Sequence, residues 1–399
     1  MQIFHRLGHV FGGSLLIAAT AIGVGMLALP VATGPMGFGP SMLMYLVVWL
    51  FMLCTGLLML EVCIWMPNDA NFITMTHRLL GPIGQGLCWA FYLFLFGTIM
   101  IAHIVGAGRV MAEIMGETLP LWKSMILYVL VFSPLIYFGT KTIDRANILL
   151  MVGVIVLFLS FIFISAKHVQ ADLLHYADWG KAWLGLPVLL TAFTYQLIIP
   201  TLMTYMDRNV KKVRLSIILG SSVPLVVYIL WEFLIMGIVP IQGENGLIAA
   251  AKQGYTAVQP LKEILGDSRI FKIGNLFAFF VFTTSYLTFS LAFLDFLADG
   301  LKIKKVGLRR VFLCLLIFVP ATIISLMNPK IFLTMLHYAG GISVAVLFCL
   351  FPPLMVWTGR YVKKYELQKP QLFGGKIMLV FLISFVVVEV ILEVKELFF

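Results

Sequence analysis

The chain has 399 residues, of which 61% are hydrophobic and 12% are charged, and its formal net charge at pH 7 is +10. Soluble domains carry about 25% charged residues, so this composition excludes a soluble protein and indicates a polytopic protein of the lipid bilayer. The basic residues lie in short segments between apolar runs, which is the distribution that a membrane imposes, and we expect no nucleic-acid partner.

The five cysteines all lie inside or at the edge of apolar runs, without a C-x-x-C spacing. This pattern favours neither a metal site nor a disulfide framework. We therefore expect no metal, and we expect no cofactor.

Eleven apolar runs are long enough to cross the membrane as helices, since one crossing needs about 20 residues. We expect an all-α fold with 11 transmembrane helices in a single membrane domain, residues 1–399. The runs lie near residues 10–33, 38–66, 83–115, 121–139, 146–166, 183–206, 214–239, 271–297, 310–327, 331–358 and 376–395.

The basic residues also predict the orientation of these spans. With the N-terminus placed inside, lysine and arginine are about twice as frequent in the inner segments as in the outer ones. Because cytoplasmic loops carry the excess of positive charge, we expect a cytoplasmic N-terminus and a periplasmic C-terminus.

The first run contains two glycines one residue apart, Gly23 and Gly25, and Pro30 follows them. Each glycine lowers helix propensity by about 1 kcal/mol relative to alanine, and unwound backbone at membrane depth is tolerated only where it is buried in protein or lines a polar cavity. The pattern predicts a break in this helix and a binding site for a polar molecule, and close helix packing through small residues is the alternative. The residues expected at the site are Ala19, Thr20, Ile22, Gly23, Val24 and Gly25.

The sixth run repeats this peculiarity, because Thr194, Tyr195 and Gln196 interrupt it and Pro200 follows. The two interrupted runs stand five helices apart. An odd offset inserts the second set of helices in the opposite orientation, which indicates an inverted repeat with discontinuous helices 1 and 6. We expect five plus five inverted helices, near residues 7–166 and 183–358, and one extra helix near residues 376–395.

Several segments along most of the chain carry a family resemblance. They are Gly13-Ser14, Ala18 to Pro30, Gly37-Phe38, Leu58 to Val62, Gly106 to Gly108, Leu186 to Leu189, Ile199-Pro200 and Tyr205 to Asn209. The sequence resembles the bacterial hydroxy and aromatic amino acid permeases of the amino acid-polyamine-organocation superfamily, and among them the tyrosine-specific and tryptophan/tyrosine permeases. The resemblance implies the leucine-transporter type of fold, the bacterial inner membrane, and uptake of tyrosine or tryptophan by proton symport with alternating access.

Two positions depart from the pattern of that family. Thr194-Tyr195-Gln196-Leu197 stands where tyrosine permeases have Phe-His-Gly or a similar sequence, and His103 stands where a tyrosine is expected. The side-chain selectivity of the family therefore does not carry over to this chain.

A zwitterionic amino acid would bring two charges into a medium of low dielectric constant, where each needs a partner. The N–H groups from Gly23 to Met26, at the positive end of a half-helix, suit the carboxylate. Carbonyl groups of Ala19, Thr20 and the segment 193–195 suit the ammonium. We expect the ring to lie against Phe96, Ile99, Phe193, Tyr195 and Phe289, although ordinary packing is the alternative for each of them, and we expect Gln196 to have a buried partner.

For the coupling proton, His103 is the first candidate because histidine titrates near physiological pH. Glu61 and Asp295 are further candidates, since carboxylates within the membrane tend to be functional. The alternatives are a neutral histidine bonded to backbone, and carboxylates paired with basic residues of the inner loops. Arg109 and Glu113, four residues apart, read as an ion pair at the outer edge.

A sodium site is the alternative to proton coupling. Thr284 and Ser285, next to Thr283, could supply hydroxyl ligands together with the carbonyl groups of Ala19 and Ile22. Hydroxyls bonded back to their own helix are the other interpretation of this cluster. The fifth run has no lysine between residues 148 and 165, which weakens a mechanism in which a lysine ammonium replaces sodium.

Other functional classes remain as alternatives. A transporter of the same fold could carry serine, threonine or a branched amino acid. An intramembrane enzyme needs convergent catalytic groups, which the sequence does not show, and an inverted repeat argues against a simple channel. We therefore expect a transporter and not an enzyme.

Overall fold

The computed structural model describes residues 2–67, 70–116, 118–265, 268–366 and 369–398. Within these ranges the chain is helical with no β-strand, and one isolated bridge joins Gly37 and Ala177. Ten helices of the described residues are long and apolar enough to cross a membrane, and a bent pair of helices makes an eleventh span. The expected all-α fold with 11 spans is confirmed.

The first five spans are built from seven helical elements. They are α1 (Gln2–Ala21), α2 (Val24–Thr33), the short 3-10 helix η1 (Gly34–Met36), α3 (Phe38–Trp65), α4 (Phe72–Ile114), α5 (Leu121–Phe138) and α6 (Thr140–Ser165).

The remaining spans follow three short outer turns. The elements are η2 (Ala166–His168), η3 (Ala171–His175), η4 (Trp179–Lys181), α7 (Leu186–Ala192), η5 (Gln196–Ile198), α8 (Ile199–Tyr205), α9 (Val210–Ile238), α10 (Leu247–Gln253), α11 (Pro260–Leu265), α12 (Ser268–Gly300), α13 (Gly307–Met327), α14 (Phe332–Tyr338), the π-helical η6 (Ala339–Leu350), α15 (Phe351–Trp357), the π-helical η7 (Thr358–Val362) and α16 (Gly375–Phe398).

Several helices are longer than the apolar runs predict. The third span begins at Phe72 rather than near residue 83, and it bends at Gly81, where φ is 78° and Pro82 follows. A positive φ is accessible to glycine without steric cost, so the bend lets a polar first segment continue into the apolar helix. The N-cap residue Asn71 starts α4 by accepting the backbone N–H of Thr74 at 2.9 Å.

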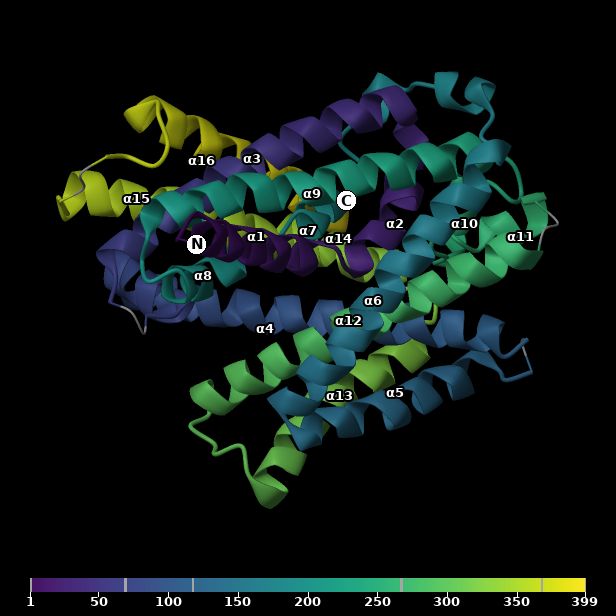
Figure 1. The fold of residues 1–399 in the computed structure, drawn as a ribbon, viewed down its shortest axis with the longest axis horizontal. Coiled ribbons are helices and arrows are strands. Elements are labelled where there is room, and N and C mark those ends of the chain that lie inside the picture. Colours follow the sequence, from purple (N-terminus) through teal and green to yellow (C-terminus); the bar gives the residue numbers. More distant parts are fainter. Residues whose placement is uncertain (1, 68–69, 117, 266–267, 367–368, 399) are drawn as a thin grey trace.

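Helices α3, α4 and α9 run roughly along the long axis of the molecule and α6 and α12 cross them obliquely, with α10 and α11 at one end of the molecule and α8 and α15 at the opposite end (Figure 1). The end with α10 and α11 is the outer one in the orientation expected from the basic residues. Segment 240–270, expected to be an outer loop, contains both of these helices, and its residues 266–267 lie outside the described residues. The N–H of Ala257 in this segment donates to the carbonyl of Leu27 at 3.0 Å, so the segment packs directly on α2.

Candidate functional site

The first span is broken at Ile22 and Gly23, between α1 and α2, and the two halves meet at an angle of 55°. Gly23 has an extended backbone with φ −151° and ψ −151°. The last regular bond of the inner half runs from the N–H of Ile22 to the carbonyl of Ala18 at 2.8 Å. The first N–H groups of α2 have no carbonyl of a preceding turn to bond, so this end of α2 is suited to an anion.

The second break interrupts the sixth span between α7 and η5. Gly25 lies directly against it, because a Cβ atom on Gly25 would come within 2.9 Å of the Cα atom of Ala192, the last residue of α7. Gly23 lies against α12 instead, where its Cβ atom would be 2.8 Å from Oγ of Ser285. Gly23 thus lies at the break itself, and Gly25 allows the close packing of α2 on α7. The binding site expected at this break remains a prediction.

Tyr228 of α9 joins the two breaks. Its hydroxyl lies 2.7 Å from the carbonyl oxygen of Ala21, at the end of α1, and 2.9 Å from that of Ala192, at the end of α7. The side chain is fully buried, and the ring of Phe193 packs edge-on against it at a centroid distance of 5.0 Å. The sequence analysis missed Tyr228, and the available signal was a phenol group in an otherwise apolar span.

The polar residues of the second break are held by α3. The hydroxyl of Tyr195 donates to the carbonyl of Met52 at 3.0 Å, and the amide of Gln196 donates to the same carbonyl at 3.2 Å and to the hydroxyl of Thr55 at 2.9 Å. Gln196 therefore has buried partners, as expected of an amide within the membrane. The hydroxyl of Thr194 bonds back to its own helix, at the carbonyl of Leu190.

The expected ring-contacting residues of α4 and α12 lie together. Phe96 faces Phe289 at a centroid distance of 6.4 Å, and His103 lies 5.8 Å from the same ring. Ile99 is buried between them on α4, and its carbonyl oxygen lies 2.7 Å from Nδ1 of His103. Phe96 also stacks on Phe293 at 4.9 Å, which is ordinary core packing.

Comparison with known proteins decides the family. A model of the tryptophan/tyrosine permease family matches residues 7–393. The chain belongs to this family. The permease is 29% identical to a tryptophan-specific transport protein of Pseudomonas aeruginosa, over 98% of this chain and 95% of that protein. It is also 29% identical to tyrosine-specific transport system 1 of Haemophilus influenzae, over 94% of each chain. It is a multi-pass membrane transporter and not an enzyme.

The fold of the permease is that of a leucine-transporter-type protein. The crystal structure of MhsT in complex with L-phenylalanine matches it with a TM-score of 0.64, covering 96% of this chain and 97% of that one at 14% identity. The expected fold class, with discontinuous helices 1 and 6, is confirmed. The boundaries expected for the two repeats remain a prediction.

Two of the three expected proton carriers in the permease are in ion pairs. Glu61 accepts two bonds from Arg360, at 2.5 and 2.7 Å, and a third from the backbone N–H of Gln371 at 2.8 Å. Asp295 pairs with Lys305 at 2.8 Å in an exposed position. The third carrier, His103, is fully buried, and its Nε2 atom has no partner among the described residues.

The hydroxyls expected at a sodium site of the permease have other partners. Thr283 bonds to the carbonyl of Phe279 at 2.7 Å, and Thr284 bonds to that of Val281 at 3.0 Å. Of this cluster, Ser285 lies closest to the first break, beside Gly23. Ala19 is exposed and Ile22 is half-buried at the same break.

Arg109 and Glu113, expected as an ion pair, bond elsewhere in the permease. Arg109 donates to the carbonyl of Pro329 at 3.0 Å and lies 4.6 Å from the ring centre of Tyr255. Glu113 accepts the amide of Gln259 at 3.3 Å. Both residues therefore tie α4 to the outer segments, which agrees with their expected place at the outer edge.

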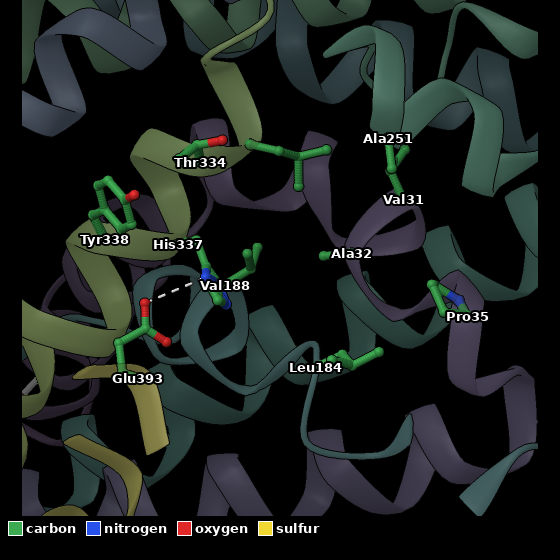
Figure 2. Close-up of a pocket in the computed structure, with 11 residues that line it drawn as sticks. Val31, Ala32, Pro35, Leu184, Val188, Ala251, Thr334, His337, Tyr338 and Glu393 are labelled. Atoms are coloured by element: carbon green, nitrogen blue, oxygen red, sulfur yellow. Dashed lines mark ion pairs between the residues drawn. The ribbon is translucent and has the colours of Figure 1, made fainter. Parts of the chain in front are cut away.

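A pocket of about 360 Å³ lies on the outer halves of both broken spans (Figure 2). Val31 and Ala32 of α2 line one side and Val188 of α7 lines another. At the far side His337 of α14 lies 3.3 Å from Glu393 of α16. Below this pocket the next turn of α2 is completely buried, so the pocket ends above the first break.

Proposed function

We propose that the permease is a secondary active transporter that imports tyrosine, tryptophan or both across the bacterial inner membrane. It does so by proton symport with alternating access. The observation that carries this proposal is the meeting of the two helix breaks at Tyr228, in a chain of the tryptophan/tyrosine permease family. The relatives named above are a tryptophan-specific and a tyrosine-specific transporter, and the matched structure holds L-phenylalanine.

The substrate site that we propose lies at the breaks. The carboxylate of the amino acid binds the free N–H groups at the start of α2, from Gly23 to Gly25, with Val24 between them. The ammonium binds carbonyl groups of Ala19, Thr20 and the segment 193–195. Both half-helices that end here, α1 and α7, point the negative ends of their dipoles towards the ammonium.

The substrate ring lies in our proposal on the apolar side of the site. Phe96, Ile99 and Phe289, which pack together from α4 and α12, are proposed to contact the ring, together with Phe193, which packs on Tyr228 at the breaks. Tyr195 and Gln196 hold the unwound segment against α3, because their polar groups bond to that helix. In our proposal they act as positioning residues of the ring site.

The coupling ion in this proposal is a proton. Among His103, Glu61 and Asp295, the geometry favours His103, because the two carboxylates already have basic partners. The sodium alternative rests on Ser285 beside Gly23, with Thr284 and the carbonyls of Ala19 and Ile22. The bonds that Thr283 and Thr284 make to their own helix weigh against it.

Alternating access is supported by the unequal packing of the two halves of the first span. The outer half α2 contacts α7, α9, α10, α12 and α14, whereas the inner half α1 packs mainly on α9. Phe11 and Leu15 of α1 are 67% and 50% exposed. Because α1 packs mainly on one helix whereas α2 packs on five, we expect α1 to move relative to the bundle while α2 stays in place. The N-terminus is cytoplasmic and the C-terminus periplasmic in this scheme.

The test is uptake of labelled tyrosine into proteoliposomes under an imposed proton gradient, with and without sodium, in competition with tryptophan, phenylalanine and serine. A gradient of one pH unit can drive at most about tenfold accumulation per proton. Accumulation without sodium, blocked by tryptophan but not by serine, is the expected result. Accumulation only with sodium would contradict proton coupling, and blockage by serine would contradict the substrate class.

A further inference from the structure

Glu232 of α9 is a carboxyl group that the proposed substrate site does not use. It is completely buried. Its Oε1 atom bonds to the hydroxyl of Thr33, at the end of α2, and its Oε2 atom accepts the hydroxyl of Tyr45 of α3 at 2.7 Å. Both partners are neutral, and among the described residues no basic side chain forms an ion pair with Glu232. An unpaired carboxylate buried in this way is costly by several kcal/mol, so burial favours the protonated form.

The hydrogen atoms around Glu232 can be counted. The hydroxyl of Thr33 has one hydrogen but lies within bonding distance of two oxygen atoms, Oε1 of Glu232 and the carbonyl of Leu29, the latter at 2.7 Å. If Thr33 donates to Leu29, the hydrogen between Thr33 and Glu232 must come from the carboxyl group. Both contacts are hydrogen bonds only when Glu232 is protonated.

The charged and titratable groups around Glu232 are few. Tyr45 faces it from α3, and Tyr228 lies one turn before it on α9. From α2 the contact is the uncharged Thr33. The turns η2 and η3 pack on the outer end of α9. Their titratable residues Lys167, Asp172 and His175 are exposed, and His168 is half-buried. The charge of Glu232 therefore depends on whether water can reach it.

We propose that Glu232, rather than His103, binds the coupling proton of the permease, an inference that rests on the proposed symport. The proton comes from water on the outer side and binds Oε1, and the acid then donates to Thr33 while Thr33 donates to Leu29. This chain of bonds ties α9 to α2 and stabilises the closed outer half. In symport this proton is then released to water on the inner side. Its loss turns the Thr33 hydroxyl towards the carboxylate, frees the carbonyl of Leu29, and leaves a buried charge whose cost of desolvation favours separation of α2 from α9.

Glu232 is also linked to the substrate site. Residues four apart lie on the same face of a helix, so Tyr228 extends from this face of α9 one turn further into the membrane. Its hydroxyl reaches the carbonyls of Ala21 and Ala192 at the two breaks. A substrate ammonium on the neighbouring carbonyls of Thr20 and segment 193–195 would therefore lie next to groups held by the same helix face as the proton.

The test compares Glu232→Gln with Glu389→Gln in proteoliposomes. Glutamine keeps the size of the side chain and mimics the neutral acid. Glu389 of α16 is a matched control, because it is also a membrane glutamate, is only 5% exposed, and its carboxylate oxygens have no partner among the described residues. Each variant is measured for tyrosine counterflow exchange without a gradient and for accumulation under a gradient of one pH unit.

We expect the counterflow exchange rate of Glu232→Gln to lie within about twofold of the wild-type rate. The same variant should lose accumulation under the pH gradient, which in the wild type can reach about tenfold per proton. Glu389→Gln should keep both activities. Accumulation by Glu232→Gln at the wild-type level would overturn this inference while leaving the proposed function intact. Absence of proton-driven accumulation by the wild type would instead contradict the proposed function itself.

A second variant keeps the inference testable if Glu232→Gln does not fold. Tyr45→Phe removes one donor to Oε2, and a hydrogen bond to a charged acceptor is stronger than one to a neutral acceptor. Its loss therefore disfavours the carboxylate, and the pH at which uptake is half-maximal should move upwards. An unchanged pH profile in a folded Tyr45→Phe protein would overturn the role of Glu232.

Discussion

The hydroxyl of Tyr228 lies 2.7 Å from the carbonyl oxygen of Ala21, the residue at which the inner half of the first span ends. The same hydroxyl reaches the end of α7 at Ala192. A phenol has one hydrogen, so it satisfies the two carbonyls only in part. Tyr228 therefore links the two broken helices directly beside the carbonyl groups of Thr20 and Phe193, which we propose for the substrate ammonium.

Replacing Tyr228 by phenylalanine removes this link without changing the shape of the ring. We expect the apparent KM for tyrosine to rise about tenfold, equivalent to about 1.4 kcal/mol, which is the scale of one buried hydrogen bond. Uptake kinetics check this expectation. Tyr92→Phe is the control, because the buried hydroxyl of Tyr92 has no partner among the described residues, and its kinetics should not change. An equal effect of both variants would contradict the bridging role of Tyr228.

Gly25 should tolerate no side chain. A methyl group there would meet Cα of Ala192 at 2.9 Å, a backbone atom that cannot move aside without shifting α7. We expect Gly25→Ala to reduce uptake at least about tenfold while the protein still inserts, because the two breaks are forced apart. Gly97→Ala on α4 is the matched control, since nothing lies within 4 Å of the added atom. Uptake by Gly25→Ala equal to that of Gly97→Ala would show that this close approach has no function.

Gly23 is expected to be equally sensitive, for a different reason. Its Cβ position lies 2.8 Å from Oγ of Ser285 and 4.0 Å from the carbonyl oxygen of Ala21, at the first break. Gly23→Leu should abolish substrate binding, measured by counterflow or by thermal stabilisation with tyrosine, while membrane insertion remains. Normal uptake by this variant would show that the first break is not part of the binding site.

The ion pair of Glu61 predicts a loss of stability rather than of coupling. Removing one partner of a buried pair costs about 3–5 kcal/mol, and Glu61 is completely buried while Arg360 is 11% exposed. Glu61→Gln should therefore clearly lower the unfolding temperature of the detergent-solubilised protein. Asp295→Asn breaks an exposed pair with Lys305 and should cost less than about 1 kcal/mol. If the Glu61→Gln protein is as stable as the wild type and loses only proton-driven accumulation, this prediction is wrong and Glu61 takes part in proton coupling.

Much of the architecture could be predicted because the bilayer imposes it on every span. Apolar length predicted the 11 spans, and glycine, proline and polar residues inside two of them predicted the breaks at Gly23 and at Thr194 to Gln196. Span ends were less accurate, as at α4, because a polar helical turn outside the apolar core carries no hydropathy signal.

The roles of single polar residues depended on partners far away in the sequence. Nothing next to Glu61 indicates that Arg360 lies beside it, and Gln196 finds its partners on α3. Tyr228 and Glu232 stood in the sequence as isolated polar residues of one apolar helix.

The sequence by itself therefore determined the membrane location, the number of spans and the place of the two breaks. These follow from local composition, since hydrocarbon solvent acts on each segment independently. Only the tertiary structure decided which polar groups meet: Tyr228 with Ala21 and Ala192, and Glu232 with Thr33 and Tyr45. A hydrogen bond needs two groups within about 3 Å, and the packing of helices distant in the chain brings these groups together.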